Sequence, residues 1–225
     1  MKKFAKFAAE PAPLKVVDFR DTSPVALQTV DFRSVDEAFR EDPPWVKHAR
    51  EKNKENDPVH RRLFMDGKKD KVHSAVKNYT KGSERLNTHL FKTEGNPKES
   101  FHEKIGHIDK YLSSKPSPVE FHTYSGLHKA PKPGLHVHHG YMSTSLEPTT
   151  AHEFARGPDT HILRLHIKKD SKHGAYLEPH TKNKDEREFL VGRGKHIHIH
   201  PEPEKHDYYG STVHVWHGDI VDHKE

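Results

Sequence analysis

The chain has 225 residues, of which 31% are hydrophobic and 32% are charged, and its mean hydropathy is −1.01. It has no cysteine, which excludes disulfides and thiolate zinc sites. The 38 basic side chains nearly balance 33 acidic ones, so the net charge of +5 lacks the concentrated basic charge typical of nucleic-acid binding. No stretch reaches the roughly 20 apolar residues of a membrane span, and Met1–Glu10 lacks the apolar core of a signal peptide. We therefore expect no membrane or nucleic-acid partner and a cytoplasmic place of action.

Residues 1–33 read as an extended N-terminal arm, because prolines interrupt them and a Val-Asp-Phe-Arg segment occurs twice. A capping box at Ser34 predicts the start of a short helix, which the prolines after Asp42 should end. The densely charged residues 47–71 predict a helix followed by a loop. We expect residues 34–225 to form a single domain.

The first half of that domain, residues 34–116, reads as a helical lobe. Apolar side chains repeat at helical spacing in three segments, and prolines follow the last one. The repeats are Val72, Val76 and Tyr79, then Leu86 and Leu90, and then Phe101, Ile105, Ile108 and Leu112.

The second half, residues 117–225, changes to short strands. A short helix is expected around Ala151–Ala155, between the second and third strands. Helices first and strands afterwards predict an α+β domain with a mostly antiparallel sheet or sheet pair. The expected strands are 119–125, 141–143, 161–167, 175–177, 189–191, 196–200 and 212–216.

Two glutamates, Glu186 and Glu188, lie two positions apart just before an apolar strand. In an extended chain they project side by side, with Arg187 on the opposite face. A carboxylate pair suits chemistry that builds positive charge on a sugar, since one group stabilises the cation while the other handles the nucleophile. A solvated acidic turn contains the same pattern, so its meaning depends on the rest of the chain.

Three blocks occur in order: Phe121–Leu127, an aromatic strand with a glycine exit; Gly140–Leu146, which contains a Ser-Thr-Ser segment; and Glu186–Leu190. This order resembles the mono-ADP-ribosyltransferase family of the arginine/serine/glutamate class, in particular the small enzymes of tailed bacteriophages and the bacterial exoenzyme domains. The likeness covers about residues 72–221, and upstream it includes Tyr79-Thr80 and Leu86-Asn87, although helix packing and capping explain those residues equally well.

The resemblance implies a helical N-terminal lobe followed by a mixed, mostly antiparallel two-sheet core. It also implies that NAD is the co-substrate, that no metal is required, and that ADP-ribose moves to a protein side chain as nicotinamide leaves. If the chain is phage-encoded, the family implies a host acceptor such as RNA polymerase or the translation machinery. Action would then be in the host cytoplasm, with packaging in the virion as an option.

Residue roles follow from the same resemblance. Glu188 would be the catalytic carboxylate, which binds the ribose 2′-hydroxyl and stabilises an oxocarbenium-like ribose, as in glycosidase chemistry. Glu186 would orient and deprotonate the acceptor, and a glutamate there goes with arginine acceptors. Ser143 would hydrogen-bond Glu188. Thr144 and Ser145 would support the nicotinamide-ribose pocket and the position of the strand.

The first motif departs from the family pattern, which is usually aromatic-Arg-Gly. Aligned on Tyr124-Ser125-Gly126, Ser125 occupies the arginine position, and Gly126 offers backbone groups to the nicotinamide amide. Aligned on the earlier aromatic residue, His122 occupies it instead. The next arginine along the chain is Arg156, which we expect to bind the NAD phosphate, with His122 as the second candidate.

Two alternatives remain open. The missing arginine suits a family member with weak catalysis that acts as a binding or virion protein. The 23 histidines suit a metal-binding module, because two histidines at i and i+2 on a strand can share a metal ion. A solvent-facing strand contains the same pattern. The histidines concerned are His196, His198 and His200 on one predicted strand, and a loop cluster of His136, His138 and His139.

Overall fold

The computed structural model describes residues 42, 44–64, 71–155, 159–178, 180–181, 186–208 and 211–221, with the side chains of 55–64 excepted. The expected arm over residues 1–33 and the helix expected from Ser34 lie outside the described residues, and the division into arm and domain stays a prediction. The described helices are α1 (Pro44–Phe64), α2 (Lys71–Lys81), α3 (Glu84–Lys92), α4 (Glu99–Leu112) and α5 (Pro148–Phe154). The described strands are β1 (Phe121–Leu127), β2 (Gly134–His138), β3 (Met142–Ser145), β4 (Thr160–Ile167), β5 (Gly174–Tyr176), β6 (Glu188–Val191), β7 (Lys195–Ile199), β8 (Glu204–Tyr208) and β9 (Ser211–Val221).

The three helices of the predicted lobe are confirmed. In α2, α3 and α4, most side chains that repeat at helical spacing are buried, among them Val76, Leu90 and Ile108 at 0% exposure, while Val72 and Phe101 are partly buried. The prolines after Asp42, which were expected to end a helix, lie at the start of another one, because α1 begins at Pro44. Proline suits the first helical position, where the missing N–H has no intrahelical partner.

The strands form a hydrogen-bonded array in the order β2-β7-β9-β4-β1-β3-β6-β5, with β8 paired to β9. Only β4 and β9 run parallel within the described residues. Along β1 and β4 seven positions pair, whereas β1 and β3 pair at the single position Tyr124–Ser145. Strands β3, β6 and β5 therefore form a smaller sheet joined to the larger one at one point, which confirms the α+β class with a mixed, mostly antiparallel core.

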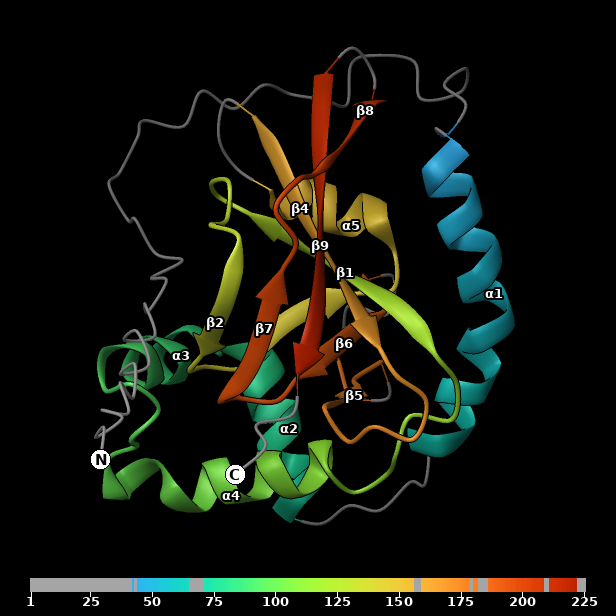
Figure 1. Ribbon diagram of the computed structural model, residues 1–225. Helices are drawn as coiled ribbons and strands as arrows, with labels where there is room; N and C mark the ends of the chain where they lie inside the picture. The colour runs from blue at the N-terminus through green and yellow to red at the C-terminus, as the bar shows by residue number, and fades with distance from the viewer. Residues whose placement is uncertain are drawn as a thin grey trace, which may run out of the picture.

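Apolar side chains fill both faces of this array. One face, which includes Leu163 and Leu165, packs against α2, α3 and α4, which gather at the lower end of the molecule (Figure 1). The opposite face packs Tyr124 and Ile162 against α1 and α5. Since successive strand residues point to opposite faces, β4 is apolar at Ile162 and at both leucines. None of the described helices is long and apolar enough to cross a membrane.

Two strands, β2 and β8, are absent from the sequence prediction. In β2 the usual alternation is inverted, because His136 and His138 point inward at 6% exposure while Leu135 is 40% exposed. The expected loop cluster of histidines is therefore wrong for these two residues. The ring of His138 donates a hydrogen bond from Nδ1 to the carbonyl of Gly140 (2.9 Å) and packs on Phe91.

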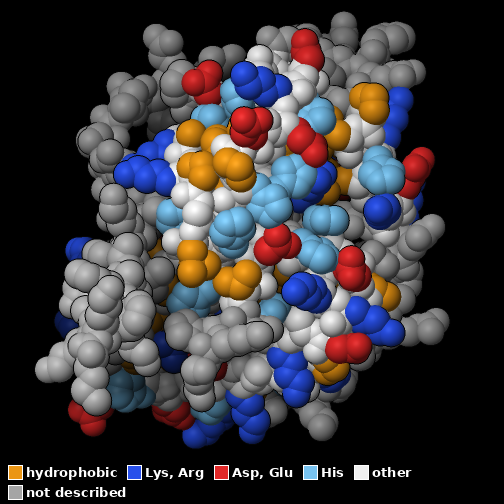
Figure 2. All heavy atoms as spheres, in the orientation of Figure 1, with side chains coloured by type: hydrophobic (Ala, Val, Ile, Leu, Met, Phe, Trp, Pro, Cys, Tyr) orange, Lys and Arg blue, Asp and Glu red, His pale blue; other side chains and the backbone are white. Residues whose placement is uncertain are grey.

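The alternating histidines of β7 behave as predicted. Ile197 and Ile199 are buried, while His198 and His200 face outward. They belong to a histidine-rich surface that spreads over β4, β7 and β9 (Figure 2). Among the described residues, no group of three or more histidines and carboxylates is placed to hold a metal ion. On this surface histidines contact carboxylates, as His200 does with Asp219 at 2.8 Å and His166 does with both Asp219 and Glu120.

Candidate active site

A cavity of about 490 Å³ opens between the helical lobe, α5 and the junction of the two sheets. Its size lies within the range of small-molecule sites. Residues from α2, β1, β3, α5 and the start of β6 line it, so the helical lobe and both sheets contribute to the cavity. The lining residues are Tyr79, Thr80, Ser83, Tyr124, Ser125, Gly126, His128, Ser143, Thr144, Ser145, Thr150, Ala151, Phe154, Glu186 and Glu188.

Glu188 is the first residue of β6, and its carboxyl group lies at the cavity wall. Burial raises the pKa of this carboxyl to about 7, the charge of Glu186 adds to the rise, and a hydrogen bond with Ser143 opposes it. The backbone of Glu188 is fixed independently, since its carbonyl accepts a hydrogen bond from Leu177 N–H at 2.8 Å. The predicted contact between Ser143 and Glu188 is therefore present.

Glu186 reaches the same cavity by a different route from the one expected. The segment is not extended, because Glu186 lies in a helical turn and Arg187 has φ +44°. The expectation that alternation along a strand places the two carboxylates together is thus wrong in its reason. Arg187, in its left-handed conformation, is what places the two carboxylates together. Its carbonyl accepts a hydrogen bond from Leu146 N–H at 3.1 Å.

Thr144 is buried and connects three strands. Its hydroxyl donates to the carbonyl of Phe189 on β6 (2.5 Å) and accepts from the hydroxyl of Thr123 on β1 (2.6 Å). These bonds lie where β1 and β3 share one paired position, so side-chain hydroxyls replace part of the missing ladder. Ser145 donates to the carbonyl of Glu186 at 2.6 Å. Both residues are placed to support the strands around the glutamates.

The Tyr124-Ser125-Gly126 segment of the first motif lies at the cavity wall. Tyr124, Ser125 and Gly126 all line the cavity, and Ser125 donates to the carbonyl of Ser143 at 3.2 Å. At Gly126 a Cβ would lie 2.2 Å from the Ala151 carbonyl oxygen, so glycine is what lets α5 rest directly on β1.

Of the two candidates for the missing arginine, only His122 is among the described residues. His122 stacks on His166 with ring centroids 5.3 Å apart and is absent from the lining, so its expected place is wrong. Burial lowers its pKa to about 4, and the charge of Arg164 adds to that shift. Arg156 lies outside the described residues. Among the described lining residues, His128 is the sole basic side chain.

Sequence reasoning missed several lining residues. Tyr79 is 1% exposed, and its hydroxyl is linked by hydrogen bonds to Ser143 and Ser83. It also accepts a hydrogen bond from Asn87 Nδ2 at 2.9 Å. The same side-chain amide accepts a hydrogen bond through Oδ1 from the backbone N–H of Tyr141. Helical periodicity marks Tyr79 as a core residue, which it also is. Burial raises the pKa of its hydroxyl, which stays protonated.

Phe154, at the end of α5, is another lining residue to which the sequence analysis gave no role in the site. It lines the cavity although its side chain is 53% exposed. Its place in the lining puts the ring where it can contact a ligand in the cavity. The sequence signal was the aromatic residue itself, at the end of a short helix after the Ser-Thr-Ser segment.

Comparisons with known proteins agree with this geometry. Residues 135–213 match the family model of the ADP-ribosyltransferase exoenzyme. No curated protein matches the sequence. Similar solved structures include Plx2a, an ADP-ribosyltransferase toxin from Paenibacillus larvae, with a TM-score of 0.60 and 18% identity over 78% of this chain and 96% of that one. C3stau2 from S. aureus, solved with NAD, gives 0.58 and 17% over 78% and 95%.

A third similar structure is the enzymatic component C2-I of the C2 toxin from Clostridium botulinum, with a TM-score of 0.61 and 17% identity over 74% of this chain and 46% of that one. At these identities the structural likeness shows the fold. The match of residues 135–213 to the family model agrees with the predicted recognition as a mono-ADP-ribosyltransferase and with the predicted enzyme class, an NAD–protein ADP-ribosyltransferase.

Proposed function

We propose that this chain transfers ADP-ribose from NAD to a protein side chain, an arginine in the first place, and that the cavity around Glu188 is where it does so. The observation that supports this most directly is the buried carboxyl of Glu188, hydrogen-bonded to Ser143 and flanked by Glu186 in a cavity of suitable size. A buried carboxylate is a strong electrostatic partner for a developing cation.

In the proposed reaction the bond between the ribose C1′ and the nicotinamide nitrogen breaks. The bonding electron pair goes to the nicotinamide ring, which leaves as a neutral molecule, and positive charge builds on the ribose. Ionised Glu188 accepts a hydrogen bond from the ribose 2′-hydroxyl and stabilises that charge. Ser143 and Tyr79 hold the carboxylate in place by their hydrogen-bond network.

The acceptor then attacks C1′, and its proton passes to Glu186. A guanidinium suits this position, because a glutamate orients it by charge-assisted hydrogen bonds and accepts the proton that it loses as the bond to C1′ forms. The exposed ring of Phe154 offers a flat apolar wall for the nicotinamide. Arg156 stays our proposal for the NAD phosphates, because His128 is the sole basic side chain in the described lining.

The test incubates the protein with labelled NAD and a bacterial lysate. We expect Glu188→Ala to abolish label transfer, while Glu153→Ala, an exposed glutamate on α5, retains it. Glu186→Ala should lose transfer but keep hydrolysis of NAD. Transfer that survives Glu188→Ala would contradict the assignment. Mass spectrometry of the labelled peptide identifies the acceptor residue, and we expect arginine.

The identity of the acceptor protein is a further part of the proposal. If the chain is phage-encoded, a host protein such as RNA polymerase or a component of translation, modified in the host cytoplasm, fits the family resemblance. The same labelled lysate tests it, since the labelled band is identified directly. A band that belongs to neither system would contradict this part alone.

A catalytically weak member of the family, acting as a binding or virion protein, is the second candidate. The observation in its favour is the lack of an arginine or lysine in the described cavity lining. Calorimetric titration with NAD discriminates between the two candidates. Binding in the micromolar to low millimolar range supports the enzyme, and no heat at several millimolar supports the binding protein.

A further inference from the structure

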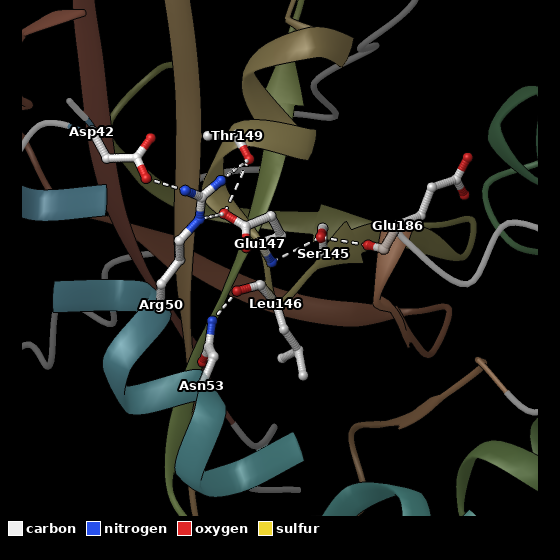
Figure 3. Close-up of polar contacts among 8 residues, drawn as sticks. All are labelled: Asp42, Arg50, Asn53, Ser145, Leu146, Glu147, Thr149 and Glu186. Carbon is white, nitrogen blue, oxygen red and sulfur yellow. Dashed lines mark hydrogen bonds and ion pairs between the residues drawn. The ribbon is translucent and has the colours of Figure 1, made fainter. Parts of the chain in front are cut away.

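The corner at Leu146 and Glu147, which connects β3 to α5, is held from outside by α1 (Figure 3). Arg50 of α1 donates from Nε to the Glu147 carboxylate at 2.8 Å and from a terminal nitrogen to the Thr149 hydroxyl at 3.2 Å. Its other terminal nitrogen pairs with Asp42. Thr149 also donates to the Glu147 carboxylate at 3.0 Å, so guanidinium, hydroxyl and carboxylate form a closed set.

Asn53, one turn along α1, holds the neighbouring residue. Its side chain is buried at 4% exposure, and its amide donates to the carbonyl of Leu146. Residues three apart on a helix lie on the same face, so Asn53 and Arg50 can hydrogen-bond to the consecutive residues Leu146 and Glu147. Burial lowers the pKa of Arg50, but the hydrogen bond and charge of Glu147 raise it on balance, so the guanidinium stays charged.

From this corner, hydrogen bonds continue to the candidate acceptor-handling glutamate. The backbone N–H of Glu147 donates to the Ser145 hydroxyl at 2.8 Å, and that hydroxyl donates to the carbonyl of Glu186 at 2.6 Å (Figure 3). A serine hydroxyl has one proton, so the N–H of Glu147 sets the direction in which that proton points.

The segment that receives this support needs it. Arg187 follows Glu186 at φ +44°, a conformation that is strained for a non-glycine residue and persists only where the surroundings impose it. Glu188, by contrast, is fixed by the pairing of β6 with β3 and by its hydrogen bond with Ser143. A loosened corner should therefore disturb Glu186 more than Glu188.

We infer that Arg50 is a positioning residue that acts through Glu147 and Ser145 on Glu186, and that it sets how the ADP-ribosyl group divides between the protein acceptor and water. This inference rests on the proposed function. It makes α1, which contributes no residue to the described cavity lining, part of what determines transfer.

The experiment measures two rates on the full chain: nicotinamide release without acceptor, and label transfer to the lysate protein that the wild type modifies. Arg50→Ala should lower the ratio of transfer to hydrolysis by about tenfold to a hundredfold, because small displacements of a reacting group cost that much. Hydrolysis and the Kd for NAD should change by less than about threefold. Arg50→Lys should restore part of the ratio, since lysine keeps the charge without the forked geometry.

Two further variants separate positioning from folding. Lys54→Ala removes an exposed basic residue from the same helix and should leave the ratio unchanged. Glu147→Gln weakens the ion pair while keeping the shape, and it serves if Arg50→Ala does not fold. When both changes are combined, the loss of ratio should not exceed that of Arg50→Ala alone, because the two residues act in one chain of contacts.

An unchanged ratio in both Arg50→Ala and Glu147→Gln would overturn the inference, as would parallel losses of both rates or an equal loss in Lys54→Ala. Failure of the proposed function gives a different result. In that case the wild type releases no more nicotinamide than Glu188→Gln, and the inference fails with it.

Discussion

The carboxyl of Glu188 has a pKa of about 7, so near neutral pH it is divided between its acid and its anion. The proposed chemistry uses the anion. We therefore expect kcat/KM for NAD, measured as nicotinamide release between pH 5 and 9, to rise with pH and reach half its maximum near pH 7. Glu186→Gln removes a neighbouring negative charge and should move the midpoint to lower pH. A profile that is flat from pH 6 to 8 would contradict this.

The same shift affects stability. The pKa of Glu188 in the folded state lies above the ordinary glutamate value of 4.5, so between pH 4.5 and 7 the native state binds more protons than the unfolded state. Above pH 7 the buried anion destabilises the fold. Glu188→Gln should therefore raise the free energy of unfolding at pH 8, on the order of 1–3 kcal/mol, and much less at pH 5.

Urea unfolding at the two pH values measures this difference, with Glu153→Gln on the exposed side of α5 as the control. Equal gains at pH 5 and pH 8 would mean that burial of charge at Glu188 is not the cause.

Among the elements, α5 and β1 approach most closely at Gly126. A Cβ there would meet the backbone oxygen of Ala151, which cannot move away as a flexible side chain could. Gly126→Ala should cost about 3 kcal/mol or more and weaken NAD binding, because α5 forms one wall of the cavity. Denaturant unfolding and calorimetry measure the two effects.

Gly106 on α4 provides the matched control. A Cβ there meets nothing within 4 Å, and the residue lies inside a helix, so Gly106→Ala should stabilise the fold by about 0.5–1 kcal/mol. If Gly126→Ala is as stable as this control, the close contact of α5 with β1 does not carry the wall of the cavity.

Elements whose burial follows the hydrophobic pattern could be predicted from the sequence. This holds for α2, α4 and β4, where each apolar repeat became a buried face. Strand β2 could not be predicted, because His136 and His138 occupy the inward positions where the pattern would need apolar residues, while Leu135 faces outward.

The candidate site shows the same division. Ser143, Thr144, Ser145, Glu186 and Glu188 were found by their order along the chain, and the structure brings them to one cavity. The positive φ between the two glutamates was not predictable, because arginine rarely adopts it and only the Leu146 contact shows why it does here. The partnership of α1 with the site depends on residues about 97 positions apart, a separation at which sequence spacing carries no information.

At the scale of the whole molecule, the histidine-rich surface over β4, β7 and β9 lies away from the cavity (Figure 2). Burial lowers the pKa of both His122 and His217, and Arg164, which donates to His217 at 2.8 Å, adds to both shifts. Burial alone would raise the pKa of Asp219, but hydrogen bonds from His200 and His166 lower it on balance. The fold therefore favours the neutral forms of His122 and His217.

Because the pKa of His122 falls from 6.5 to about 4, the unfolded state binds more protons than the native state between those values. Its contribution to stability is present above pH 6.5 and is lost as the pH falls toward 4. His122→Gln should therefore flatten the fall in urea midpoint between pH 7 and pH 4.5. His198→Gln, on the exposed side of β7, is the control, and an equal flattening in both variants would contradict the assignment to His122.

The account as a whole depends on one buried carboxylate that cleaves NAD inside the cavity between the two sheets and the helical lobe. Nicotinamide release by Glu188→Gln, measured at pH 8 beside calorimetric binding of NAD, tests this most directly. We expect NAD to bind the variant about as tightly as the wild type, while nicotinamide release falls by about 10²–10³-fold. A variant that releases nicotinamide at the wild-type rate would contradict the account.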